Sequence, residues 1–104
     1  MNIIELEQRI IKWANDRSLF DKSNYEKQTL KTMEEFGELA KGFLKKDENL
    51  IIDSYGDIII TMIISLNQYF GIGKISIFEC LSKAFYEIEN RKGKTINGTF
   101  IKDD

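Results

Sequence analysis

The sequence predicts a single all-α domain of four helices that ends in a short β-like hairpin, and three observations lead to this prediction. Apolar residues recur every three or four positions along four separate stretches of the chain. Residues typical of helix N-caps precede these stretches. Near the C-terminal end, an Asn-Gly pair lies between β-favouring residues, which is the strongest short-range hairpin signal. The length of 104 residues and the 42% hydrophobic content fit one domain over residues 1–104.

The first helix is predicted over about residues 3–16, because apolar residues keep helical spacing there and Asn2 is a suitable N-cap. A polar link over residues 16–23 follows. Ser23 then starts an S-x-x-E pattern of the capping-box type, which predicts a second helix that continues to about Lys46.

The third predicted helix covers about residues 50–70 and is apolar on nearly all faces. Asp47 or Asn49 is expected to cap it, and Gly71 and Gly73 are expected to end it.

A further S-x-x-E pattern at Ser76 predicts a fourth helix that ends near Gly93. The hairpin is predicted in the tail after Lys94, with its turn at Asn97 and Gly98. Because an isolated two-stranded hairpin is only marginally stable, we expect it to pack on the helices or on a neighbouring subunit.

The composition excludes several classes of function. The chain carries 15 Lys and Arg against 17 Asp and Glu, so its net charge of −2 gives no basic field to hold a nucleic acid polymer. Histidine is absent, which removes Ser-His and Cys-His catalysis and histidine-based zinc sites. A single cysteine, Cys80, excludes an intramolecular disulfide. Hydrolytic chemistry must therefore rest on carboxylates, a metal ion, Lys or Tyr.

No membrane span is expected, because the longest apolar stretch, Ile58 to Leu66, is far shorter than the ~20 residues that a spanning helix needs. The N-terminal residues carry acids and no small-residue cleavage site, which argues against a secretory signal. We therefore expect a soluble cytoplasmic protein without a membrane partner.

Two groups of acids stand out. Glu35 and Glu38 share one face of the second helix, with Glu34 one turn from Glu38. These acids either form a solvated face that pairs with Lys31 and Lys41, or they belong to a site.

On the third helix, Asp53 and Asp57 are four residues apart and share their line with Ile60 and Ile64. Carboxylates among apolar residues need protons, partners or a metal ion. Carboxylates that converge from two adjacent helices form a hard-oxygen site suited to Mg²⁺ or Mn²⁺, which lowers the pKa of bound water.

A cationic cluster lies at the end of the fourth helix and comprises Lys83, Asn90, Arg91, Lys92 and Lys94. Such cations either complement the helix dipole or clamp an anionic ligand, for which Arg91 offers a planar fork. Trp13 is a candidate for stacking on a base, although aromatic residues at helical spacing are more often core residues.

These residues fit a known pattern. Residues 34–40, EEFGELA, resemble the EE-x-G-E-L block of the MazG-like nucleotide pyrophosphohydrolases, members of the all-α NTP pyrophosphatase superfamily. Residues 54–57, SYGD, stand where that family has its second acidic block, usually E-x-x-D. Residues 86–100 are similar to the tail of short, phage-type members. The resemblance covers the chain from Trp13 to Phe100 and implies the four-helix bundle-like MazG fold.

The resemblance implies an activity. In the family, Mg²⁺ ions held by the acidic blocks bind a nucleoside triphosphate, and a metal-activated water cleaves it between the α and β phosphates. The products are a nucleoside monophosphate and pyrophosphate. Carried over, the metal ligands are Glu35, Glu38, Asp53 and Asp57. Glu34 is either a further ligand or the group that orients the water, and the candidate phosphate contacts are Lys83, Asn90, Arg91 and Lys94.

Ser54 departs from the family's pattern, because the nearest acid is Asp53, four residues before Asp57 instead of three. A shift of one residue turns a side chain by ~100° on a helix. Asp53 either ligates directly, ligates through water, or leaves a second metal ion weakly held. The departure keeps an alternative function open, a non-catalytic helical oligomer that serves as a binding or regulatory module.

A homo-oligomer, a dimer or a tetramer, is also expected. The third helix is apolar on all faces, and three other short helices cannot cover it completely. We therefore expect an interface that uses Ile52, Ile59 and Ile63, or Ile60 and Ile64. The resemblance implies the same, because short members of the family pair helices across subunits to complete the nucleotide pocket.

Overall fold

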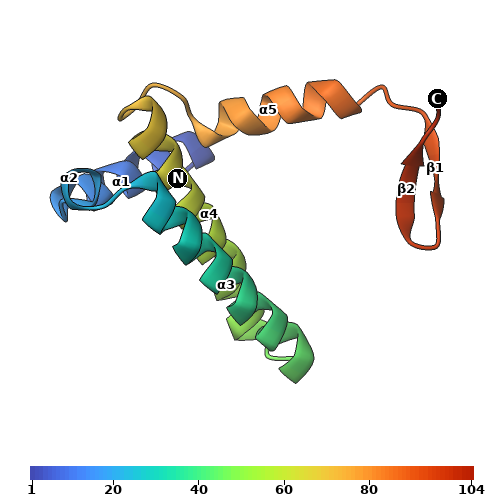
Figure 1. The fold of residues 1–104 in the computed structure, drawn as a ribbon, viewed down its shortest axis with the longest axis horizontal. Coiled ribbons are helices and arrows are strands. Elements are labelled where there is room, and N and C mark those ends of the chain that lie inside the picture. Colours follow the sequence, from blue (N-terminus) through green and yellow to red (C-terminus); the bar gives the residue numbers. More distant parts are fainter.

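The computed structural model describes all residues from 1 to 104 and confirms a mostly helical chain with a C-terminal hairpin (Figure 1). In chain order the elements are α1 (Ile3–Asp16), α2 (Leu19–Lys22), α3 (Tyr25–Lys45), α4 (Glu48–Phe70), α5 (Ile77–Ile88), β1 (Gly93–Ile96) and β2 (Thr99–Lys102). Five helices are present instead of the four expected, because the polar link after α1 contains the short helix α2.

The predicted N-caps account for most helix starts. The side chain of Asn2 accepts a hydrogen bond from the Glu5 amide, and Asp47 caps α4 through the amide of Leu50. Ser76 forms the predicted capping box with Glu79. The start of α3 differs from the prediction, because Asn24 is the N-cap and not Ser23, which ends α2. The fourth predicted helix, α5, ends at Ile88, well before Gly93.

The longest helices, α3 and α4, form an antiparallel pair that packs along its whole length. The hydroxyls of Thr32 and Thr61 lie 2.7 Å apart across this contact and are buried. Near the connecting turn the helices approach closely at Gly42, where a Cβ atom would lie 3.0 Å from Cγ1 of Ile51. These two contacts fix the register of α3 against α4 and therefore of the side chains between them.

Helices α1 and α2 pack on α4 as well, so α4 has neighbours on more than one side. Ile63 and Ile64 of α4 are 1% and 3% exposed and belong to the core of the chain itself. The expectation that they form a subunit interface is therefore wrong. Ile52 and Ile59 do remain exposed.

Helix α5 makes few contacts with the other helices, and a hydrogen bond holds its first turn. The buried carboxylate of Glu7 in α1 accepts a hydrogen bond of 2.6 Å from the amide of Ile77. From there α5 extends away from the α3–α4 pair and carries the hairpin at its far end (Figure 1). One chain alone therefore does not close the four-helix bundle-like arrangement that was expected.

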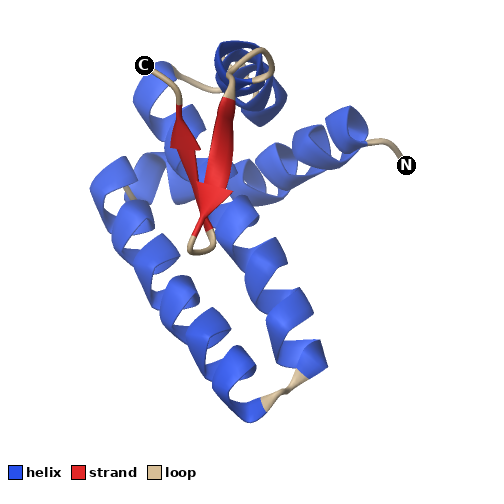
Figure 2. Cartoon of the chain, turned by 90° about the vertical axis from the view of Figure 1, so that its right-hand side faces the viewer, coloured by secondary structure: helices blue, strands red, loops and turns tan.

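The hairpin forms as the Asn-Gly signal predicts. Its strands pair in antiparallel register, with Thr95 opposite Phe100. Figure 1 shows the hairpin away from α1 to α4, and Figure 2 views the two strands face-on in front of the helices. Asn97 and Gly98 have φ angles of 51° and 79°, the left-handed conformations that a tight type I′ turn requires. The ring of Phe100 lies where a side chain on Gly93 would be, so this glycine makes room for it.

Helix α4 is, by length and composition alone, able to cross a membrane, with 23 residues and a mean hydropathy of 1.5 over its most apolar window. The expectation from the sequence considered only the shorter stretch inside it. A central helix of a folded domain has the same properties. We interpret α4 as such a helix, because its buried polar side chains Thr61 and Asn67 find hydrogen-bond partners within the chain.

Candidate functional site

The acids of the two predicted blocks lie in the middle of the α3–α4 pair, between the Thr32–Thr61 contact and the close approach at Gly42. Burial shows which residues face the neighbouring helix. On α3 these are Thr32, Leu39 and Gly42, and on α4 they are Ser54, Ile58 and Thr61. Glu35 belongs to the same stripe of α3, since it is half-buried and lies three residues after Thr32.

Three of the predicted acids each precede a contact residue by one position. Glu38 precedes Leu39, Asp53 precedes Ser54 and Asp57 precedes Ile58. A residue that precedes a contact residue is turned by ~100° about the helix axis, away from the neighbouring helix. Because α3 and α4 are antiparallel and face each other, this turn points to the same side of the pair on both helices. Glu38, Asp53 and Asp57 therefore lie on one side of the α3–α4 pair, where they are exposed. We call this side, with these three acids, the acidic side.

The structure does not gather these carboxylates into a finished metal site. No three Asp, Glu or Cys side chains of the chain lie close enough together to hold a metal ion. Glu34 pairs with Lys31 instead, with 3.4 Å between the Lys31 Nζ and Glu34 Oε2 atoms. Both side chains of this pair are exposed, so Glu34 fits the solvated-face interpretation.

Ser54, where the family that the sequence resembles usually carries a glutamate, is buried. It is 1% exposed and lies in the contact between α4 and α3. The fourth carboxylate on the acidic side of the pair is therefore available only from Asp53, one position away.

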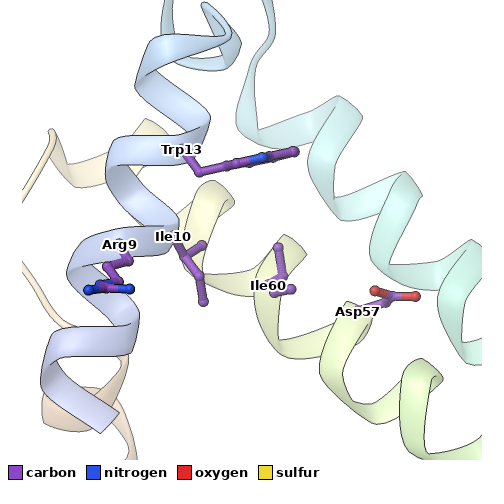
Figure 3. A pocket seen from close by; sticks show the side chains of 5 residues that line it. All are labelled: Arg9, Ile10, Trp13, Asp57 and Ile60. Carbon is purple, nitrogen blue, oxygen red and sulfur yellow. The ribbon is translucent and has the colours of Figure 1, made fainter. Parts of the chain in front are cut away.

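Asp57 also lines a pocket between α1 and α4 (Figure 3). The other lining residues are Arg9, Ile10 and Trp13 from α1 and Ile60 from α4. In Figure 3 the Trp13 ring extends from α1 over this space, and the Asp57 carboxylate lies at the opposite end. The pocket thus combines an aromatic surface, a guanidinium and a carboxylate.

Trp13 is about half exposed and is not a core residue. The guanidinium carbon of Arg17 lies 4.4 Å from the centre of its ring, which is a cation–π contact. The sequence interpretation missed Arg9, although it precedes Trp13 by four residues and the two therefore share a face of α1. That spacing was the signal that could have found it.

The predicted phosphate contacts are not brought to the acids within one chain. Lys83 lies on α5, and Asn90, Arg91 and Lys94 lie in the segment that leads from α5 into β1. All four are exposed, and Lys83 lies 3.6 Å from the Glu87 carboxylate. Because α5 extends away from the α3–α4 pair, this cluster is separate from the Asp57 pocket in the isolated chain (Figure 1).

The donor set, made up of half-buried Glu35 and the three exposed acids beside it, fits Mg²⁺ or Mn²⁺ in its chemistry. Glu35, Glu38, Asp53 and Asp57 offer only carboxylate oxygens, which are the ligands that these hard ions prefer. Three of these side chains, those of Glu38, Asp53 and Asp57, are exposed and free to change rotamer.

Comparison with known proteins identifies one relative. The chain is similar to an uncharacterized 18.2 kDa protein encoded in the rep–hol intergenic region of Haemophilus phage HP1 (strain HP1c1), with 44% identity over 64 residues. The match covers 62% of this chain and 39% of that protein, so the chain spans about two fifths of the relative's length. No protein-family model matches the chain. No solved structure matches it either.

Proposed function

We propose that this chain is a metal-dependent nucleoside triphosphate pyrophosphohydrolase. It hydrolyses ribo- or deoxynucleoside triphosphates between the α and β phosphates and releases a nucleoside monophosphate and pyrophosphate. The observation that carries the proposal is the position of Asp57, which lies both on the acidic side of the α3–α4 pair and in the pocket with Trp13 and Arg9. A carboxylate site for a cation thus adjoins a surface suited to a base.

The residues have separate roles in this proposal. Glu35, Glu38, Asp53 and Asp57 hold Mg²⁺ or Mn²⁺, which when bound supplies positive charge for the triphosphate and a water that ionises near neutral pH. Trp13 stacks on the nucleobase, since base–aromatic stacking accepts any base. Arg9 offers its planar guanidinium to phosphate oxygens. Glu34 is either a further ligand or the group that orients the attacking water.

A soluble nucleotide substrate also agrees with the proposed compartment and with the absence of a nucleic acid partner. Such a substrate places the protein in the cytoplasm, and the net charge of −2 favours no nucleic acid polymer as partner. Lys83, Asn90, Arg91 and Lys94 remain candidate phosphate contacts, which reach the acids only if another chain presents them.

The second candidate function is a non-catalytic binding or regulatory module. The observation in its favour is that the carboxylates are not gathered into a group that holds a metal ion. Such a module would bind a nucleotide in the Asp57 pocket without turning it over.

A panel of nucleoside triphosphates distinguishes the two functions. We expect pyrophosphate release that requires Mg²⁺ or Mn²⁺ and stops when a chelator is added. Equilibrium binding of the same nucleotides is measured in parallel. Binding without any pyrophosphate release over the whole panel would favour the module and contradict the enzyme.

A further inference from the structure

Two arginines flank Trp13 along α1. Arg9, Trp13 and Arg17 follow each other at intervals of four residues, so they lie along one face of the helix and its C-terminal cap. Arg9 lines the Asp57 pocket together with Trp13, whereas Arg17 does not line it. The pocket therefore adjoins Trp13 from the N-terminal direction of α1, and Arg17 adjoins it from the C-terminal end.

Arg17 contacts Trp13 in two ways. Its guanidinium carbon lies over the ring, 4.4 Å from the centre. Its Nη1 atom also donates a hydrogen bond of 3.1 Å to the main-chain carbonyl oxygen of Trp13. No salt bridge engages Arg17, so no carboxylate competes for its guanidinium. The Trp13 side chain is about half exposed, and these contacts restrict the rotamers that it would otherwise sample.

The two faces of the Trp13 ring have different surroundings. The guanidinium of Arg17 covers one face. In Figure 3 the ring lies above Ile10 and Ile60 and is seen nearly edge-on, so one face is turned toward the pocket. Because Arg17 does not line the pocket, the face that it covers is the other one. The ring thus has a cation on one face and an open pocket on the other.

We propose that Arg17 is a positioning residue for the nucleobase: it holds the Trp13 ring over the pocket and leaves the opposite face free for stacking. This inference rests on the proposed function, because it assigns the base to Trp13. Arg17 does not touch the nucleotide and acts only through the ring. A ring that is already held in place loses less conformational freedom when a base stacks on it, and this raises affinity.

The affinity of nucleotides for an Arg17 variant tests the proposal. The probes are α,β-methylene analogues of ribo- and deoxynucleoside triphosphates, added with Mg²⁺, because they keep the base and resist cleavage between the α and β phosphates. Cation–π contacts at exposed sites are weak, so Arg17→Ala is expected to lower affinity by about 2- to 5-fold. The main-chain amide of Arg17 still caps α1 in this variant.

Lys12→Ala is the matched control. It removes the same charge from the same end of α1, but Lys12 pairs with Asp16 at 2.7 Å and neither covers the Trp13 ring nor lines the pocket. We expect Lys12→Ala to keep the affinity of the unaltered chain, because an exposed ion pair of this kind contributes little.

A double variant shows whether Arg17 acts through Trp13. If it does, Arg17→Ala causes no further loss of affinity in a chain that already carries Trp13→Ala. Trp13 is also the only tryptophan, so tryptophan fluorescence reports on this ring alone. Quenching by acrylamide is expected to increase in Arg17→Ala, where both faces are open. A saturating analogue should suppress quenching almost fully in the unaltered chain and only in part in Arg17→Ala.

The outcomes separate this inference from the proposed function. Equal losses of affinity in Arg17→Ala and Lys12→Ala, or a further loss when Arg17→Ala is added to Trp13→Ala, would overturn the role of Arg17 and leave the enzymatic activity untouched. Absence of analogue binding to the unaltered chain would overturn it as well. The expected dependence on Arg17 without pyrophosphate release from hydrolysable nucleotides would support this role and contradict the enzyme.

Discussion

Trp13 is the residue that best tests the nucleotide-binding part of the site, because it lines the Asp57 pocket and is half exposed. Stacking of a base on an aromatic ring contributes about 1–3 kcal/mol. Trp13→Ala is therefore expected to weaken nucleotide binding by about 5- to 150-fold. The matched control is Tyr55→Ala, which removes an aromatic residue of similar exposure that lies outside this pocket. Equal losses of affinity in both variants, measured by titration, would contradict the assignment.

Ser54 gives a second test at the scale of one residue. Replacing it with glutamate gives the E-x-x-D spacing of the family that the sequence resembles. However, the side chain is 1% exposed and lies between α4 and α3, so the new carboxylate would lose its hydration. We expect Ser54→Glu to lower the free energy of unfolding by about 2–4 kcal/mol.

The control for Ser54→Glu is Asp53→Glu, which lengthens an exposed acid one position away and should leave stability nearly unchanged. Chemical denaturation measures both variants. A Ser54→Glu protein as stable as the unaltered chain would show that the position opens toward the acidic side.

The sequence predicted residue positions well where the signal is local. The four-residue spacing of Asp53 and Asp57 placed them on one face of a helix, and the structure confirms that both are on the same side of α4. Glu7 was missed, although it occupies a core-facing position between Ile3 and Ile10. Its partner, the amide of Ile77, is 70 residues away in the sequence, and no local pattern indicates that pairing.

At the scale of elements, two glycines of α3 provide a matched pair. Nothing lies within 4 Å of a Cβ atom placed on Gly37, whereas one on Gly42 would lie 3.0 Å from Ile51 Cγ1 and 3.2 Å from the Ile51 backbone nitrogen. In a helix interior, alanine is favoured over glycine by about 1 kcal/mol.

We therefore expect Gly37→Ala to raise the melting temperature by a few degrees and Gly42→Ala to lower it. Thermal unfolding followed by circular dichroism measures both. A rise in both variants would mean that α3 and α4 are not in close contact at Gly42.

The helices were predictable because their ends carry local signals. Asn2, Asp47 and Ser76 cap the helices that their positions indicated. The errors occurred where two signals compete within one turn, as with Ser23 and Asn24. The short helix α2 was missed because four residues are too few to show a helical period.

At the scale of the whole molecule, the arrangement of the helices was less predictable than the helices themselves. The apolar stripe on α5 was visible in the sequence, but periodicity does not tell which surface a stripe contacts. The apolar residues of α4 likewise suggested an interface at Ile63, whereas that residue is buried within the chain. A single sequence therefore predicts which face of a helix is apolar, but it does not predict which surface packs against that face.

Metal binding should change the stability of the whole molecule. Glu38, Asp53 and Asp57 are like charges on one side of the α3–α4 pair, and an ion that binds them stabilises the folded state by mass action. At a Mg²⁺ concentration 100 times the dissociation constant, this stabilisation is about 2.7 kcal/mol. The melting temperature of the unaltered chain is expected to rise with Mg²⁺, and that of Asp57→Asn much less. Identical shifts in both proteins would mean that the ion binds elsewhere.

The central claim is that carboxylates on the α3–α4 pair support hydrolysis of nucleoside triphosphates between the α and β phosphates. Its most direct test is the product analysis of Mg²⁺-dependent turnover by the unaltered chain, by Asp57→Asn and by Glu26→Gln. Glu26 lies in the first turn of α3, away from the acidic side, and serves as the control. We predict nucleoside monophosphate and pyrophosphate in equal amounts from the unaltered chain and from Glu26→Gln, and almost none from Asp57→Asn. Full turnover by Asp57→Asn, or release of orthophosphate in place of pyrophosphate, would contradict the account.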